Sequence, residues 1–194
     1  LNIERKQDKE ENMDFLDKRV GVICNELKKL KVKQIFPLTQ WEYKEGNFVH
    51  PEDALNDAAA WENFDCKTMH WYGKDRHYWF RTVYTVPQEL DGKNMWIRIS
   101  SQIDEWDDAK NPQFIVFING EIYQGIDMNH RECLITQSAK AGDTLTIELQ
   151  AYTGILHEEF ALRTQIEEID AGIESLYYDL WVPLAAFSRM EADD

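Results

Sequence analysis

The chain has 194 residues, and 43% of them are apolar, which is enough for one sizeable hydrophobic core. Its 36 acidic and 21 basic residues give a formal net charge of −15. This balance disfavours nucleic acid and anionic membrane surfaces as partners, because phosphate groups are bound by clusters of Lys and Arg. The sequence carries no secretory signal and no apolar run long enough to cross a membrane. We therefore expect a cytoplasmic protein.

The three cysteines, Cys24, Cys66 and Cys133, lie far apart and form no C-x-x-C pair. This spacing favours neither a disulfide framework nor a zinc ribbon.

Residues 1–37 are predicted to form a helical segment that is frayed at residues 1–8 and helical from Lys9 to Val32. Apolar residues in it recur three and four positions apart, at Leu16, Val20, Ile23, Leu27 and Leu30. This stripe either packs on the chain itself or a neighbour, or forms a seam between two copies. Residues 38–75 are predicted to be an extended lead-in, in which Pro51 can begin a short helix.

Residues 76–170 are predicted to form antiparallel strands, at about 78–86, 94–101, 114–118, 132–136, 144–151 and 159–169. Asn119-Gly120 predicts a two-residue hairpin turn, because both central residues of a type I′ turn need positive φ. We expect this hairpin to be buried on both faces and its return strand to break at Gly125. Short strands with frequent turns predict a mainly β fold, an antiparallel β-sandwich of jelly-roll or galactose-binding-like type.

Two further expectations concern solvent exposure and the C-terminal end. Glu148 and Glu167 fall on the predicted outward faces of their strands. Residues 171–194 are predicted to be a helical linker, kinked at Pro183, with a broad apolar face that includes Leu176, Tyr177 and Trp181.

The residue pattern predicts no active site within this chain. It contains no H-E-x-x-H, no P-loop, no G-x-S-x-G and no G-x-G-x-x-G. Asp75 with His77, and Asp127 with His130, are spaced so that a carboxylate and an imidazole can meet, but loop carboxylates more often accept bonds from backbone N–H groups. The polar loop after the hairpin is the main candidate surface, through Gln124, Asp127, Asn129, His130 and Arg131. Trp106, in a long acidic loop, is the candidate for stacking on a sugar.

Several segments resemble one known family. They are WYGKDRHYWFRTVYTVPQELDGKNMWIRIS at 71–100, PQFIVFINGEIYQGIDMNHRECLI at 112–135, AGDTLTIELQAYTG at 141–154 and ESLYYDL at 174–180. In this order they resemble the N-terminal accessory domain of α-mannosidases of glycoside hydrolase family 38, of the cytosolic and vacuolar type with bacterial members.

The resemblance implies a β-sandwich that precedes a catalytic (β/α) barrel. The full-length enzyme would hydrolyse α-mannosides with a divalent metal, zinc or cobalt, held near an H-x-H-x-D segment. That segment is absent from these residues, so we expect no catalytic residue, metal ligand or cofactor here, and no activity of the chain alone.

The predicted function is therefore a non-catalytic part of an α-mannosidase, with its own catalytic domain and α-mannoside glycans as partners. In that case the interface or glycan-cleft rim residues are Gln124, Asp127, Asn129, His130 and Arg131. The alternatives are a stand-alone carbohydrate-binding module and an oligomerisation domain that pairs through the N-terminal stripe.

Overall fold

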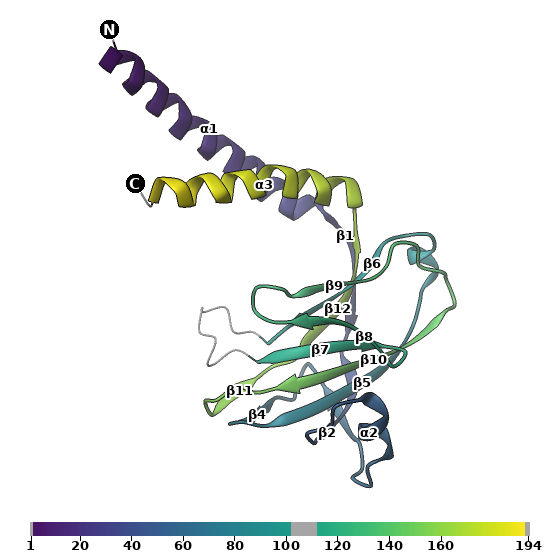
Figure 1. Cartoon of the computed structure of the whole chain (residues 1–194). Coiled ribbons are helices and arrows are strands. Elements are labelled where there is room, and N and C mark those ends of the chain that lie inside the picture. Colours follow the sequence, from purple (N-terminus) through teal and green to yellow (C-terminus); the bar gives the residue numbers. More distant parts are fainter. Residues whose placement is uncertain (1, 102–111, 193–194) are drawn as a thin grey trace. The chain divides into compact units, whose positions relative to one another are not determined.

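The computed structural model describes residues 2–101 and 112–192 (Figure 1). These residues form two compact units, one helical and one rich in strands. The helical unit combines the N-terminal residues up to 33 with the residues from 169 onwards, and the strand-rich unit runs from 34 to 168. None of the described helices is long and apolar enough to cross a membrane.

The larger sheet of the strand-rich unit has six strands in the order β3-β2-β5-β10-β7-β8. Their bounds are Gln40–Glu45 for β2, Glu62–Asp65 for β3, His77–Thr85 for β5, Gln113–Ile118 for β7, Glu121–Ile126 for β8 and Thr144–Tyr152 for β10. Each neighbouring pair is antiparallel. The two nine-residue strands β5 and β10 lie at its centre.

A second sheet of four strands has the order β1-β12-β6-β9. These strands are β1 at Val32–Leu38, β6 at Met95–Ser100, β9 at Glu132–Thr136 and β12 at Arg163–Ile169. A small sheet pairs β4, Trp71–Gly73, with β11, Glu158–Phe160. A single turn of 3₁₀ helix, Gln88–Leu90, follows β5. The predicted mainly β fold, an antiparallel β-sandwich with an N-terminal and a C-terminal helix, is confirmed.

One hydrophobic core lies between the two larger sheets. The four-stranded sheet contributes Ile97, Ile99 and Ile166, and the six-stranded sheet contributes Phe80 and Leu149, all at most 1% exposed. Around them are aromatic side chains from the segments that carry the family resemblance. Trp71 contacts the rings of Tyr78, Phe80, Phe114 and Phe160 at centroid distances of 5.1–5.6 Å.

The outer face of the six-stranded sheet is partly covered by α2, Pro51–Asn56. Ala54 of this short helix packs with Trp79 and Phe117 in a second small cluster. Lys44, only 4% exposed, fixes the covering segment because its Nζ donates to Asp57 Oδ1 at 3.1 Å and to the carbonyl of Ala59 at 3.2 Å. A charge this deeply buried needs such partners.

This cover explains why Glu148, predicted to face solvent, is buried. Glu167, also predicted to face solvent, is buried on β12 of the other sheet. Glu148 is 3% exposed and lies 3.7 Å from the Nε atom of Arg81. Glu167 is 2% exposed and accepts a hydrogen bond from the amide of Gln165. Strand alternation predicts which face a residue lies on but not whether another segment covers that face.

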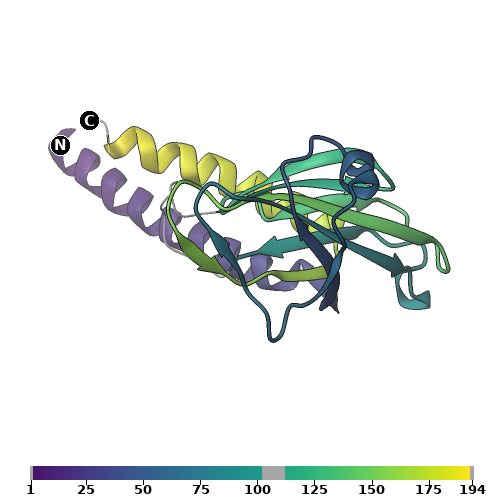
Figure 2. The ribbon, with the colours of Figure 1, turned by 90° about the horizontal axis from the view of Figure 1, so that it is seen from below.

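The helical unit contains α1, Asn2–Leu30, and α3, Ala171–Ala192, which pack together and run in opposite directions (Figures 1 and 2). A Cβ atom added at Gly21 of α1 would lie 4.0 Å from Cδ2 of Leu184 of α3. Lys31 forms an ion pair with Glu174 at 3.5 Å. Part of the α1 stripe stays exposed, at Leu16, Ile23 and Leu30, as do Leu176, Tyr178, Trp181 and Val182 of α3. The oligomerisation alternative stays a prediction.

Several predicted boundaries are corrected by the structure. The N-terminal helix starts at Asn2 instead of Lys9, and it ends at Leu30, because residues 32–38 join the four-stranded sheet. The predicted lead-in of residues 38–75 contains β2, β3 and β4, which are part of the sheets. The predicted strand 159–169 is two strands, interrupted at Ala161 and Leu162.

The hairpin of β7 and β8 is also corrected in part. Asn119 and Gly120 have φ of 53° and 83°, as the predicted turn requires. However, β8 continues through Gly125 to Ile126, and it is the edge strand of its sheet. Ile122 and Tyr123 are therefore 66% and 45% exposed, and only the β7 half of the hairpin is deeply buried.

Candidate functional site

The loop that follows β8 is organised around the carboxylate of Asp127. Its Oδ1 atom accepts the backbone N–H of Asn129 at 2.8 Å and that of His130 at 2.7 Å. It also lies 3.1 Å from Nδ1 of the His130 ring. Burial alone would raise the pKa of Asp127, but the hydrogen bonds from His130 and Asn129 outweigh it and hold this pKa below its ordinary value. The loop thus has a carboxylate that stays ionised and holds the backbone.

Two more of the predicted residues, Arg131 of the loop and Gln124 of β8, bind backbone atoms through their side chains. Arg131 Nε donates to the carbonyl of Met128 at 3.0 Å, and Gln124 donates to the carbonyl of Glu132 at 3.0 Å. Glu132 in turn pairs with Arg98 on the neighbouring strand β6. These bonds connect the edge strand β8 with the other sheet and shape the loop.

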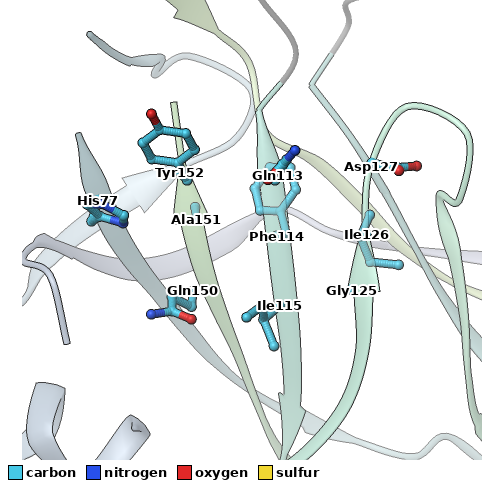
Figure 3. Close-up of a pocket in the computed structure, with 10 residues that line it drawn as sticks. All are labelled: His77, Gln113, Phe114, Ile115, Gly125, Ile126, Asp127, Gln150, Ala151 and Tyr152. Carbon is cyan, nitrogen blue, oxygen red and sulfur yellow. The ribbon is translucent and has the colours of Figure 1, made fainter. Parts of the chain in front are cut away.

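An open pocket of about 550 Å³ lies beside this loop, on the outer face of the six-stranded sheet (Figure 3). Its lining comes from β5, β7, β8 and β10 and consists of His77, Gln113, Phe114, Ile115, Gly125, Ile126, Asp127, Gln150, Ala151 and Tyr152. The register explains the grouping: His77 pairs with Tyr152, and Tyr152 pairs with Gln113, so their side chains form one row across three strands. In the next row, Ile115 pairs with Gly125, whose missing side chain leaves the space.

Tyr152 is held in place from two sides. Its ring lies 4.9 Å from the ring of His77, at an interplanar angle of 30°. Its hydroxyl donates to Oδ1 of Asp75 at 3.0 Å, and this bond raises the pKa of Tyr152. Asp75 itself has a φ of 55°, and its N–H donates to the carbonyl of Gly154 at 2.8 Å. The sequence spacing allows Asp75 and His77 to contact each other. In the structure, each of them contacts Tyr152 instead.

The structure brings some predicted site residues together and separates others. Asp127, Asn129, His130 and Arg131 share one loop, and Asp127 alone of these also lines the pocket. The Gln124 side chain donates to the carbonyl of Glu132 at the start of β9 and does not line the pocket. Trp106 lies outside the described residues. Sequence reasoning missed Gln113, Gln150 and Tyr152, which come from separate strands and share no motif.

The donor set does not fit a metal ion. Within residues 2–101 and 112–192, no three His, Cys, Asp or Glu side chains form a group that could hold one. Asp127 with His130 supplies only two candidate ligands, and the same carboxylate oxygen already accepts two backbone N–H groups. The three cysteines are free thiols, and burial raises the pKa of Cys133 to about 11, away from a metal-binding thiolate.

Of the comparisons with known proteins, only the one with solved structures finds similar chains. No protein-family model and no curated protein matches the sequence. A β-glucuronidase from Ruminococcus gnavus in complex with uronic deoxynojirimycin has a TM-score of 0.46 and 13% identity, over 72% of this chain and 30% of that chain. The crystal structure of the Ruminococcus gnavus enzyme gives 0.45 and 14%, over 71% and 29%.

These structural neighbours are glycoside hydrolases, and this chain spans about 30% of their length. A likeness of this degree is too low to assign a function. The resemblance to α-mannosidases therefore stays a prediction.

Proposed function

We propose that this chain is the N-terminal, non-catalytic β-sandwich part of a cytoplasmic α-mannosidase of the family 38 type. Its role is to support and shape a catalytic domain that lies further along the same protein. The α-mannoside substrate and the divalent metal, zinc or cobalt, belong to that catalytic domain. The support for the family is the ordered set of resembling segments at 71–100, 112–135, 141–154 and 174–180.

The observation that carries the non-catalytic role is how the loop at 127–131 uses its polar side chains. Asp127 and Arg131 bind backbone atoms of the loop, and Gln124 binds the next strand. A catalytic acid or nucleophile must have atoms available to the reacting groups of a substrate. Here these side chains maintain the shape of a surface, which fits a supporting domain.

The resembling segments also contribute to one packed core. Trp71 and Phe80 come from the first segment, and Phe114 comes from the second, and their rings are in contact. These residues of the resembling segments thus stabilise the sandwich, as expected for a domain with a supporting role.

The proposal is tested by the coding sequence that follows the codon of Asp194. We expect an H-x-H-x-D segment within the next hundred or so codons, at the start of a pattern of alternating strands and helices. A continuation without such a segment, or a stop codon directly after Asp194, would refute the α-mannosidase proposal.

A further inference from the structure

We propose that the pocket on the outer face of the six-stranded sheet binds a neutral sugar residue of a glycan. The binding inferred here does not rest on the proposed function. The described residues that line the pocket all lie in the range 77–152, within the strand-rich unit.

The size and position of the pocket fit a small ligand. Its volume of about 550 Å³ falls in the usual range of ligand sites, roughly 300–1,000 Å³. In Figure 3, Tyr152 and His77 lie on one side and Gly125 and Ile126 on the other, with Gln113 and Ile115 between them. Because the pocket is open, one residue of a longer chain can enter while the rest stays in solvent.

The lining supplies both an apolar surface and hydrogen-bonding groups. The Tyr152 ring and the Ile115 side chain offer apolar surface for the C–H face of a sugar ring. The amide of Gln113 forms no hydrogen bond with another residue in the described part of the chain, so it can both donate to and accept from a hydroxyl. Gln150 uses Nε2 on the carbonyl of Phe48, which leaves its amide oxygen as an acceptor.

The charges of the lining select a neutral ligand. Its ten residues include no Lys and no Arg, and the one carboxylate among them is Asp127. Among these ten residues a phosphate, sulfate or uronic acid would meet no Lys or Arg and would face the carboxylate of Asp127, whereas a neutral sugar brings no charge that Asp127 would repel.

The site is also pre-organised. The hydroxyl of Tyr152 is fixed on Asp75 at 3.0 Å, and its ring rests against His77. A side chain that is already ordered loses little conformational entropy when a ligand binds.

The experiment is an NMR titration of the isotope-labelled chain with methyl α-mannoside, methyl α-glucoside and methyl β-galactoside into the tens of millimolar. We expect at least one of them to shift the amide signals of Gln113, Ile115, Gly125 and Tyr152 in a saturable way. A methyl glucuronide should produce smaller shifts or none. If no neutral sugar shifts these signals, if the shifts lie elsewhere, or if the glucuronide binds equally well, the proposal is overturned.

Two variants localise the ligand. Gly125→Val should fill the pocket without disturbing the strand, since an added Cβ meets only the Phe114 carbonyl at 4.0 Å. It should weaken binding about tenfold or more while the melting temperature is unchanged or raised, because β-branched residues favour strands. Ile122→Thr, on the same strand but outside the lining, is the matched control and should bind normally.

Gln113→Ala provides a test that is independent of pocket filling. Gln113 is exposed, so the change should not affect folding. Loss of one neutral hydrogen bond should weaken binding roughly three- to tenfold. Unchanged affinity in both Gly125→Val and Gln113→Ala would refute the site. A pocket that binds any neutral sugar supports it, whatever reaction the complete gene product catalyses.

Discussion

Replacing Thr164 by valine should destabilise the strand-rich unit, because the Thr164 hydroxyl joins its two sheets. The hydroxyl accepts the indole N–H of Trp41 at 3.0 Å and donates to the carbonyl of Leu38 at 2.8 Å. Thr164 lies on β12 of the four-stranded sheet and Trp41 on β2 of the six-stranded sheet. Trp41 is 3% exposed and Thr164 is 6% exposed, so water cannot easily replace the lost partner.

The magnitude follows from the two bonds. An unsatisfied buried donor costs about 1–3 kcal/mol, and loss of the second bond adds about 1 kcal/mol. We therefore expect the free energy of unfolding to fall by about 2–4 kcal/mol. For a unit of this size, that corresponds to a melting temperature lower by roughly 6–12 °C.

The assay is thermal and urea unfolding of the chain and of two variants, Thr164→Val and Thr164→Ser. Serine keeps the hydroxyl and loses one methyl group, at a cost of about 1 kcal/mol. The expected order of stability is threonine, then serine, then valine. If the valine variant is at least as stable as the serine variant, the hydroxyl does not join the sheets as described.

Three further predictions concern charges and the hairpin turn. Burial raises the pKa of Glu148 above its ordinary 4.5, against the effect of Arg81, so ionisation of this carboxyl disfavours the folded state. The melting temperature of Glu148→Gln should therefore rise relative to that of the parent as pH rises through the raised pKa. An equal difference in melting temperature at acid and neutral pH would contradict this. The pKa of Asp127 is lowered in the folded state, so its contribution to stability is present above the ordinary pKa of 3.8 and is lost as pH falls through the pKa of the folded state. Hydrogen exchange of the His130 amide should accelerate in Asp127→Ala at neutral pH, and unchanged exchange would refute the capping role. Gly120→Ala, at a φ of 83°, should lower the free energy of unfolding by about 1 kcal/mol, measured in urea, and a stabilised variant would contradict the turn assignment.

Much of the sandwich follows from local pattern. β10 alternates apolar and polar residues over nine positions, and the Asn119-Gly120 pair fixes the turn of the hairpin. Both signals are contained in a few neighbouring residues, so they need no knowledge of the rest of the chain. β1 was missed because a helix and a strand are hard to distinguish where an amphipathic helix runs directly into a short mixed segment.

Burial and binding depend on contacts that are distant in sequence. Glu148 is buried because α2, almost a hundred residues earlier in the chain, covers that face. Likewise the pocket combines His77, Gln113 and Tyr152, whose adjacency is set by strand order and register. The residues of the loop at 127–131, in contrast, lie together because they are neighbours along the chain.

We propose that this chain supports α-mannosidase activity without catalysing it. The most direct measurement compares the complete gene product with residues 1–194 in hydrolysis of an aryl α-mannoside, each with added zinc or cobalt. We expect turnover by the complete product and none by residues 1–194. Turnover by residues 1–194 alone, or a folded complete product without α-mannosidase activity, would contradict it.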